Sequence, residues 1–224
     1  MFRSIGPVLA VMRKEFRSEL RTRYALNALF MFVVTTLAII LFAIGNENAS
    51  SEVLSGVLWI IIFFSTMSGL SRTFITEEER GTGPTLQLLT RPLTIFIGKF
   101  IFNTVLLFAI NLLTVALYLL LLTNYQIRSY DIFITIMALG TVGLSATSTI
   151  LAAIVAKANT KGTLYPVLSF PLLLPLLLSV INATKMAADG ARFLDALGEY
   201  QVLISYSVVI FTASVLLFEF IWKD

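Results

Sequence analysis

The chain has 224 residues, of which 58% are hydrophobic and 13% charged, and it contains no cysteine and no histidine. With a mean hydropathy of +0.91, this composition is typical of a membrane protein rather than a soluble domain. The two missing residue types exclude disulfides, the usual nucleophile–histidine pairs and the common ligands of zinc, copper and iron–sulfur clusters. For haem iron only the six methionines remain, which we interpret as packing residues. We therefore expect a non-catalytic chain with no metal site and no directly bound cofactor.

The first predicted element is an amphipathic helix over residues 1–24. Its apolar residues recur at steps of three and four: Ile5, Val8, Leu9, Met12, Phe16 and Leu20. Its basic residues lie elsewhere around the axis: Arg13, Lys14, Arg17 and Arg21. We expect this helix to lie flat on the cytoplasmic membrane face with its apolar side in lipid. The alternative is a basic flank that only sets the topology.

Six apolar runs follow, each close to the roughly 20 residues that a helix needs to cross a bilayer. The runs are continuous rather than alternating in polarity, which favours helices over a β-barrel. We predict an all-α integral membrane protein, with residues 1–224 forming one transmembrane domain. The predicted spans cover about 25–44, 53–70, 100–123, 132–156, 164–183 and 202–222.

The basic residues predict the orientation of these spans. Of the 16 lysine and arginine residues, only Arg128, Lys185 and Arg192 fall on the side opposite the two termini. Lysine and arginine are retained on the cytoplasmic side of membranes, so both termini are predicted to be cytoplasmic. The positive charge then serves topology and contact with anionic lipid headgroups, and it does not indicate a nucleic-acid partner.

A charged, turn-rich segment, "ITEEERGTGPTLQLLTRPL", separates the second and third runs at residues 75–93. Its three glutamates, 77–79, favour the start of a short helix, and Gly81, Gly83 and Pro84 predict a turn. An apolar patch of Leu86, Leu88 and Leu89 follows before Pro92 ends the segment. Such a short helix is suited to docking into a groove on another protein. A solvated loop whose leucines enter the headgroup region is the alternative.

Polar groups and prolines inside the spans have two interpretations. Asn103, Asn111 and the "SATST" stretch beginning at Ser145 are typical of contacts between membrane helices, which we favour over a transport pathway. In the fifth run, three prolines within ten residues predict a hinge or a bent packing element. The candidate hinge or pathway residues are Pro166, Pro171, Pro175, Asn111 and Ser145. The spans carry almost no charge, which disfavours an ordinary ion-coupled carrier.

The segment 75–93 resembles the coupling helix that follows the second span in permeases of type-2 ATP-binding cassette exporters. More narrowly, the chain resembles the haem exporter protein B (CcmB) family. The likeness is carried by "RKEFRSELRTRYALNALFMFVVTT", by "LGTVGLSATSTILAAIVAKANTKGTLYPVLSFPLLLPLLLSVINATKMAADG" and by the segment itself. One departure is "GTGPTLQLL" where the general pattern reads Gly-Thr-Leu-Glu, so that Gln87 stands in place of the glutamate.

The resemblance implies a bacterial inner-membrane permease subunit of the complex that delivers haem for cytochrome c maturation. The implied partners are a cytoplasmic ATPase, a haem-handling membrane subunit, a small single-span subunit and a periplasmic haem chaperone. ATP would act through the partner subunit, and haem would be the substrate of the complex. The implied ATPase contacts are Glu78, Glu79, Arg80, Gly81, Leu86, Leu88, Leu89, Arg91 and Pro92. Two alternatives stay open: a permease for a lipid-linked polymer or drug, and a membrane scaffold without energy coupling.

Overall fold

The computed structural model describes residues 5–44, 49–79, 81–157 and 161–223. This part of the chain is all helical, as predicted, and contains no strand. Its elements are α1 (Ile5–Thr22), α2 (Tyr24–Ile44), α3 (Ser51–Leu70), α4 (Ile75–Glu79), α5 (Gly83–Leu89), α6 (Pro92–Leu121), α7 (Tyr130–Lys157), α8 (Lys161–Asp189), the 3₁₀ helix η2 (Phe193–Ala196) and α9 (Leu197–Lys223).

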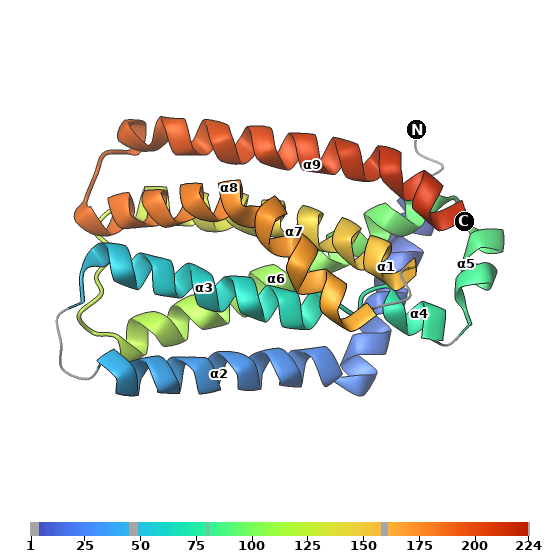
Figure 1. Cartoon of the computed structure of the whole chain (residues 1–224), viewed down its shortest axis with the longest axis horizontal. Helices are drawn as coiled ribbons and strands as arrows, with labels where there is room; N and C mark the ends of the chain where they lie inside the picture. The colour runs from blue at the N-terminus through green and yellow to red at the C-terminus, as the bar shows by residue number, and fades with distance from the viewer. Residues whose placement is uncertain (1–4, 45–48, 80, 158–160, 224) are drawn as a thin grey trace.

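The long helices α2, α3, α6, α7, α8 and α9 run along the long axis of the molecule, and the short elements gather at its two ends (Figure 1). One end holds α1, α4, α5 and the end of α9, and the other holds the end of α2, the start of α3 and the connections α6–α7 and α8–α9. Between α1 and α2, Arg23 has a left-handed φ of 51°. This conformation ends α1 and lets the chain change direction into α2.

Five of these helices are long and apolar enough to cross a membrane: Ser51–Leu70, Pro92–Leu121, Tyr130–Lys157, Val167–Asp189 and Phe193–Trp222. The first predicted span, 25–44, corresponds to α2, whose apolar part Leu29–Ile44 is shorter than these five. The structure therefore confirms a multi-pass helical membrane protein with five candidate spans. The sixth span stays a prediction.

Several helices extend beyond the predicted apolar runs. The helix of the third predicted span, α6, begins at Pro92 rather than near residue 100. Proline suits the first turn of a helix, because its missing N–H is not needed there. Pro92 therefore starts α6 as well as following α5. The connection expected over 184–201 is also largely helical, since α8 continues to Asp189 and α9 begins at Leu197. Apolar runs mark the part of a helix that lipid surrounds, whereas the backbone hydrogen bonds continue into the polar interface.

Among the five candidate spans, α7 is the most buried and the span that contains α9 is the least buried. Small residues let neighbouring helices approach α7 closely. A Cβ atom at Gly140 would lie 2.5 Å from Cη2 of Trp59 on α3, and one at Gly143 would collide with Leu176 on α8. These two glycines therefore place α7 between α3 and α8.

Polar side chains join α6 to α7 inside the bundle. Asn103 Nδ2 donates to Thr149 Oγ1 at 2.9 Å, and Asn111 Nδ2 donates to Thr141 Oγ1 at 2.9 Å. Between these two hydrogen bonds, the hydroxyls of Ser145 on α7 and Thr104 on α6 lie 2.8 Å apart. All these groups bridge two helices, as the packing interpretation predicts.

The three prolines of the fifth run do not interrupt their helix. The structure has α8 continuous from Lys161 to Asp189, and its axis bends along the half that contains the prolines (Figure 1). Pro171 and Pro175 are exposed on the helix surface, whereas the side chain of Pro166 lies outside the described residues. The bent packing element and the hinge both fit this geometry, and a helix broken at membrane depth does not.

Candidate functional site

Segment 75–93 forms two short helices rather than one. The glutamates 77–79 close α4, and Gly81 then takes a left-handed φ of 64°. Glycine adopts this conformation without the steric cost that a Cβ would bring. Thr82 is the N-cap of α5, and proline stands in its first turn, so the residues expected to form the turn partly start the second helix.

The second helix, α5, presents leucines to the solvent. Leu88 is 89% exposed and Leu89 is 73% exposed, and we call these two residues the exposed leucine pair. Leu86 is half-buried and packs against the core. The three leucines expected to form one patch therefore divide into an anchor, Leu86, and two side chains that no contact within the described chain covers.

The first helix, α4, turns its charges inward. Glu77 is buried, and its carboxylate faces Lys99, a lysine with 0% exposure two turns into α6. Lys99 Nζ lies 2.7 Å from Glu77 Oε2 and 3.0 Å from Glu15 Oε1, and it donates a hydrogen bond of 2.7 Å to the carbonyl of Thr73. The contact to Thr73 is a hydrogen bond, and the contacts to the two carboxylates are ion pairs. Its Nζ also lies 4.7 Å from the ring centre of Phe74, within the range of a cation–π contact.

A second lysine completes a group that we call the four-charge cluster: Lys14, Glu15, Glu77 and Lys99. Lys14 Nζ pairs with Glu15 Oε1 at 3.0 Å and with Glu77 Oε1. The cluster has two positive and two negative groups and is electrically balanced. Each carboxylate contacts both lysines, so α1, α4 and α6 meet in one network of ion pairs.

The pKa values of the α1 members follow from this network. Burial alone would raise the pKa of Glu15, but Lys99 and Lys14 outweigh it and hold that pKa below its ordinary value of 4.5. Burial alone would lower the pKa of Lys14, but Glu15 and Glu77 outweigh it and raise that pKa above 10.5. Both groups are therefore charged at neutral pH.

Two further contacts join α4 to the rest of the bundle. Glu78 Oε1 lies 3.3 Å from Lys157 Nζ, the last residue of α7. Phe74, just before α4, packs against Phe218 and Trp222 of α9, with ring centres 5.5 and 5.6 Å away. The five-residue helix α4 and its flank thus contact α1, α6, α7 and α9.

The predicted ATPase-contact residues other than the leucines differ in their surroundings. Glu78 is directed to Lys157, and Glu79 forms an exposed pair with Arg72 at 3.1 Å. Gly81 and Arg91 are exposed beside α5, and Pro92 begins α6. Arg80 lies outside the described residues. As ATPase contacts, all of them stay predictions.

The predicted amphipathic helix is present as α1, and its inner face packs on protein. Val11 is buried, and Phe16 meets Phe102 of α6 with ring centres 5.0 Å apart. Leu9 and Leu20 remain exposed and available to lipid. Lys14 and Glu15 lie toward α6, although the apolar pattern predicted that Lys14 would lie away from the buried side. Ion pairing therefore decides the orientation of these two residues. Sequence reasoning missed the cluster, and the signal that could have found it is Lys99, a lysine at the entrance of an apolar run.

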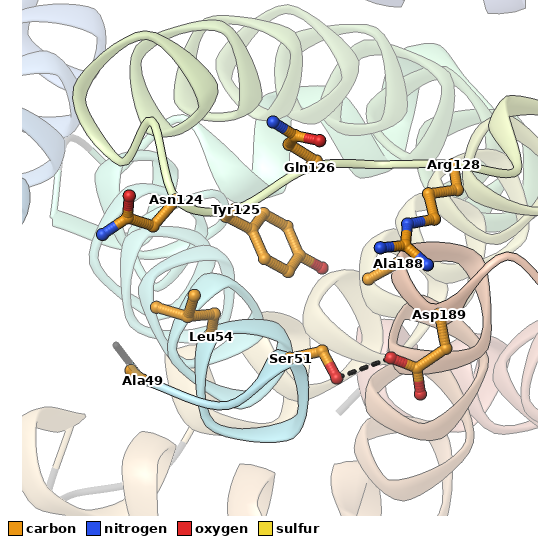
Figure 2. Close-up of a pocket in the computed structure, with 9 residues that line it drawn as sticks. All are labelled: Ala49, Ser51, Leu54, Asn124, Tyr125, Gln126, Arg128, Ala188 and Asp189. Atoms are coloured by element: carbon orange, nitrogen blue, oxygen red, sulfur yellow. Dashed lines mark hydrogen bonds between the residues drawn. The ribbon is translucent and has the colours of Figure 1, made fainter. Parts of the chain in front are cut away.

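A polar cavity of about 240 Å³ lies at the opposite end of the bundle. Figure 2 shows residues of α3, the α6–α7 connection and the end of α8 around it. Ser51 Oγ donates to Asp189 Oδ1 at 2.7 Å, and Arg128 extends along the same wall. The Arg128 stem packs over Gly190, where a Cβ would lie 3.3 Å from Arg128 Cδ. The contacts around this cavity therefore join the connections at that end of the bundle.

A known protein family matches nearly the whole chain, including the residues described above. The model of the family described as CcmB protein matches residues 7–220. The chain belongs to the CcmB family. It is also 25% identical over 202 residues to Heme exporter protein B of Bradyrhizobium diazoefficiens, covering 89% of this chain and 90% of that one. The region matched to the CcmB family includes both the four-charge cluster and the exposed leucine pair.

Proposed function

We propose that this chain is the membrane permease subunit of an ATP-driven complex that delivers haem for cytochrome c biogenesis. Membership of the CcmB family and the likeness to a heme exporter protein support the haem-transport role. The observation that carries the coupling role is the exposed leucine pair on α5. Coupling through segment 75–93 explains why two large apolar side chains face solvent on a short helix.

The energy for transport must come from another protein under this proposal. The sequence has no Gly-Lys-Ser/Thr loop to hold ATP phosphates, so a cytoplasmic ATPase subunit would supply the driving force. A helix that inserts apolar residues into a groove is a common way to bind such a partner. Burying one leucine side chain is worth roughly 1.5 to 3 kcal/mol, so the pair can anchor the contact.

The orientation supports the same arrangement. The end that carries α1, α4 and α5 also carries most of the lysine and arginine residues, which favours the cytoplasmic side of a bacterial inner membrane. Both termini would then be cytoplasmic, and α2 would be a sixth span. The cavity beside Ser51 and Asp189 would face the periplasm.

Haem is the substrate of the complex in this proposal, and this chain does not fix it through an axial ligand. The chain offers no histidine or cysteine, and Met67 is packed in the core. A haem-handling membrane subunit, a small single-span subunit and a periplasmic haem chaperone would complete the pathway. This chain would convert the motion of the ATPase into haem release.

The test is the double variant Leu88→Asp with Leu89→Asp, expressed with the other subunits. Two charged residues at the contact remove its apolar anchor, and we expect at least a hundredfold weaker ATPase binding, since about 1.4 kcal/mol is a factor of ten. The variant should accumulate normally, because both side chains are exposed. Co-purification of the ATPase and the yield of mature cytochrome c measure the outcome.

The matched control is Leu194→Asp, which changes a leucine that is 71% exposed at the opposite end. This control should keep the ATPase and the cytochrome yield. If the double variant also keeps both, α5 is not the coupling contact. If the unchanged chain binds no ATPase at all, the scaffold alternative holds. A complex that binds ATPase but does not support cytochrome c maturation would favour a permease for a polymer or drug.

A further inference from the structure

We propose that the four-charge cluster is the transmission joint of this subunit, and that Lys99 positions α6 to move together with α1 and α4. This inference rests on the proposed function, because it assigns the route by which motion at α5 enters the membrane. It divides segment 75–93 into a docking helix, α5, and a transmitting helix, α4. The segment's likeness to a coupling helix implies docking and transmission by the segment as a whole, and it does not assign them to separate helices or to these ion pairs.

The joint has to lie outside the exposed leucine pair itself. Leu88 and Leu89 are largely exposed, so we expect a displacement of α5 to reach the bundle mainly through the half-buried Leu86 and through the chain into α4 and α6. Of these routes, the one through α4 has the ion pairs described above, because the inward glutamates Glu77 and Glu78 pair with lysines of α1, α6 and α7. The side chains of α4 therefore determine which helices follow α5.

Lys99 makes the connection between α4 and α6 stiff. Its ammonium is fully buried and has oxygen atoms of Glu15, Glu77 and Thr73 within 3.0 Å. A displacement that separated α4 from α6 would break the pair between Lys99 and Glu77 and leave the buried ammonium with one carboxylate instead of two, which is unfavourable. Contacts between apolar side chains, in contrast, permit sliding at a smaller cost. The cluster therefore favours joint movement of α4 and α6 over relative movement.

The N-terminal helix is the third part of the joint. Gly98, next to Lys99, lies so close to α1 that a Cβ there would stand 2.8 Å from the Cβ of Val11. Glu15 and Lys14 of α1 then close the cluster from the same side. Close packing and paired charges at adjacent positions make α1 a clamp on the start of α6.

The ionic link from α4 to α7 at the same end is weaker, although α4 also packs directly against α7. Glu78 and Lys157 form a single ion pair, with their side chains 26% and 29% exposed, and partly exposed pairs contribute little. Deeper in the bundle, Asn103 and Asn111 bind threonines of α7. Motion would therefore enter through α6 and pass to α7 inside the membrane.

The first test is Lys99→Met, which keeps the length and the apolar stem of the side chain but removes its charge. We expect ATPase binding to remain, because the exposed leucine pair is unchanged, while haem delivered per ATP hydrolysed falls at least tenfold. The quadruple variant Lys14→Glu, Glu15→Lys, Glu77→Lys and Lys99→Glu reverses every charge, keeps all four ion pairs between opposite charges and should recover at least a third of the lost coupling. Lys157→Met is the matched control and should lower coupling less than threefold.

The results separate this inference from the proposed function. Loss of ATPase from the unchanged complex would contradict the proposed function, whereas normal coupling in an ATPase-bound Lys99→Met complex would overturn this inference alone. If Lys99→Met does not accumulate, Glu15→Gln replaces it, since Glu77 then still pairs with Lys99. Coupling should fall at least threefold in Glu15→Gln, and unchanged coupling would overturn the inference.

A second measurement asks whether α1 and α6 move as one unit. Val11→Cys with Gly98→Cys introduces the only cysteines of the chain, at positions whose Cβ atoms require a shift of about 1 Å to reach disulfide geometry. The reduced form carries the same two substitutions and is the control. The oxidised form should couple ATP hydrolysis to haem delivery with the same efficiency as the reduced form. Loss of coupling on oxidation alone, reversed by reductant, would show relative movement and overturn the inference.

Discussion

The two short helices of segment 75–93 differ in a way that reverses the ordinary pattern of burial. In α4, Glu77 is buried among lysines, and Glu78 also pairs inward. In α5, the apolar residues Leu88 and Leu89 face solvent. Buried carboxylates and exposed leucines are both unfavourable unless a partner satisfies them. The partners of α4 lie within the chain, whereas under the proposed function those of α5 come from outside it.

This difference assigns separate tasks to neighbouring helices. Contacts of α4 should affect the fold and its internal motions, and contacts of α5 should affect association. Substitutions on the two helices therefore make a direct test, because they should change different measurements. The three expected outcomes below run from the largest effect to the smallest.

The largest effect concerns the side of the membrane on which both helices lie. Thr82→Cys, between α4 and α5, should be protected from an impermeant thiol reagent in intact cells, while Arg192→Cys at the opposite end should react. Both side chains are exposed, so burial does not explain a difference, and the chain has no other cysteine. Mass spectrometry of the labelled protein measures it. Labelling at Thr82→Cys from outside would remove α4 and α5 from the cytoplasmic side and with them the coupling role.

The next effect concerns folding stability. Glu77→Gln leaves two lysines, one of them fully buried, with one remaining carboxylate. Breaking a buried ion pair by removing one partner costs about 3 to 5 kcal/mol. Thermal unfolding in detergent should show a clear destabilisation.

The matched control for this effect is Glu79→Gln, since Glu79 pairs with Arg72 at the surface of the same helix. Exposed pairs are worth about 0 to 1 kcal/mol, so this change should leave the unfolding temperature nearly constant. The double aspartate variant of α5 should also keep it. Equal destabilisation by all three variants would mean that α4 and α5 do not differ in the way described here.

The smallest effect is a pH dependence that stays flat through the neutral range. The pKa of Glu15 is lowered, so its stabilising contribution is present above 4.5 and is lost as the pH falls through the lowered value. The pKa of Lys14 is raised, so its contribution is present below 10.5 and is lost as the pH rises through the raised value. Both face Glu77 and Lys99 across the cluster.

Attachment of α1 should therefore stay constant between pH 4.5 and 10.5. Val11→Cys reports on this attachment, because Val11 is buried against α6 and becomes reactive only when α1 separates. Its labelling rate is divided by that of the exposed Thr82→Cys at the same pH, because only the thiolate reacts and its fraction changes with pH. This ratio should rise in strong acid. A change of the ratio between pH 6 and 8, for which the chain has no histidine, would show that other groups control the docking of α1.

Local sequence patterns predicted the larger part of the fold. Apolar runs located the long helices, because each run reports directly on the lipid that surrounds it, but they did not predict the helix ends, as the start of α6 at Pro92 shows. The steps of three and four predicted α1, and Gly81 correctly marked the break after the glutamates. The asparagines and Ser145 were assigned to helix contacts, since a polar group between membrane helices usually binds another helix.

The site depended on pairings that local patterns do not contain. Glu15, Glu77 and Lys99 come from three separate helices, and nothing in the sequence near each residue states which charges will meet. Counting basic residues used Lys99 only as a topological signal and did not reveal its burial. The exposure of Leu88 and Leu89 beside a half-buried Leu86 likewise depends on how α5 packs.

The sequence by itself determined the membrane class, the helices, the position of the segment 75–93 and the absence of cysteine and histidine chemistry. These properties follow from composition and short periodicities, which act over a few residues. Only the tertiary structure decided that α4 directs Glu77 and Glu78 inward to lysines while α5 leaves Leu88 and Leu89 exposed. That outcome depends on the free energy of pairing charges from distant helices, because a buried ammonium is stable only where the fold brings carboxylates to it.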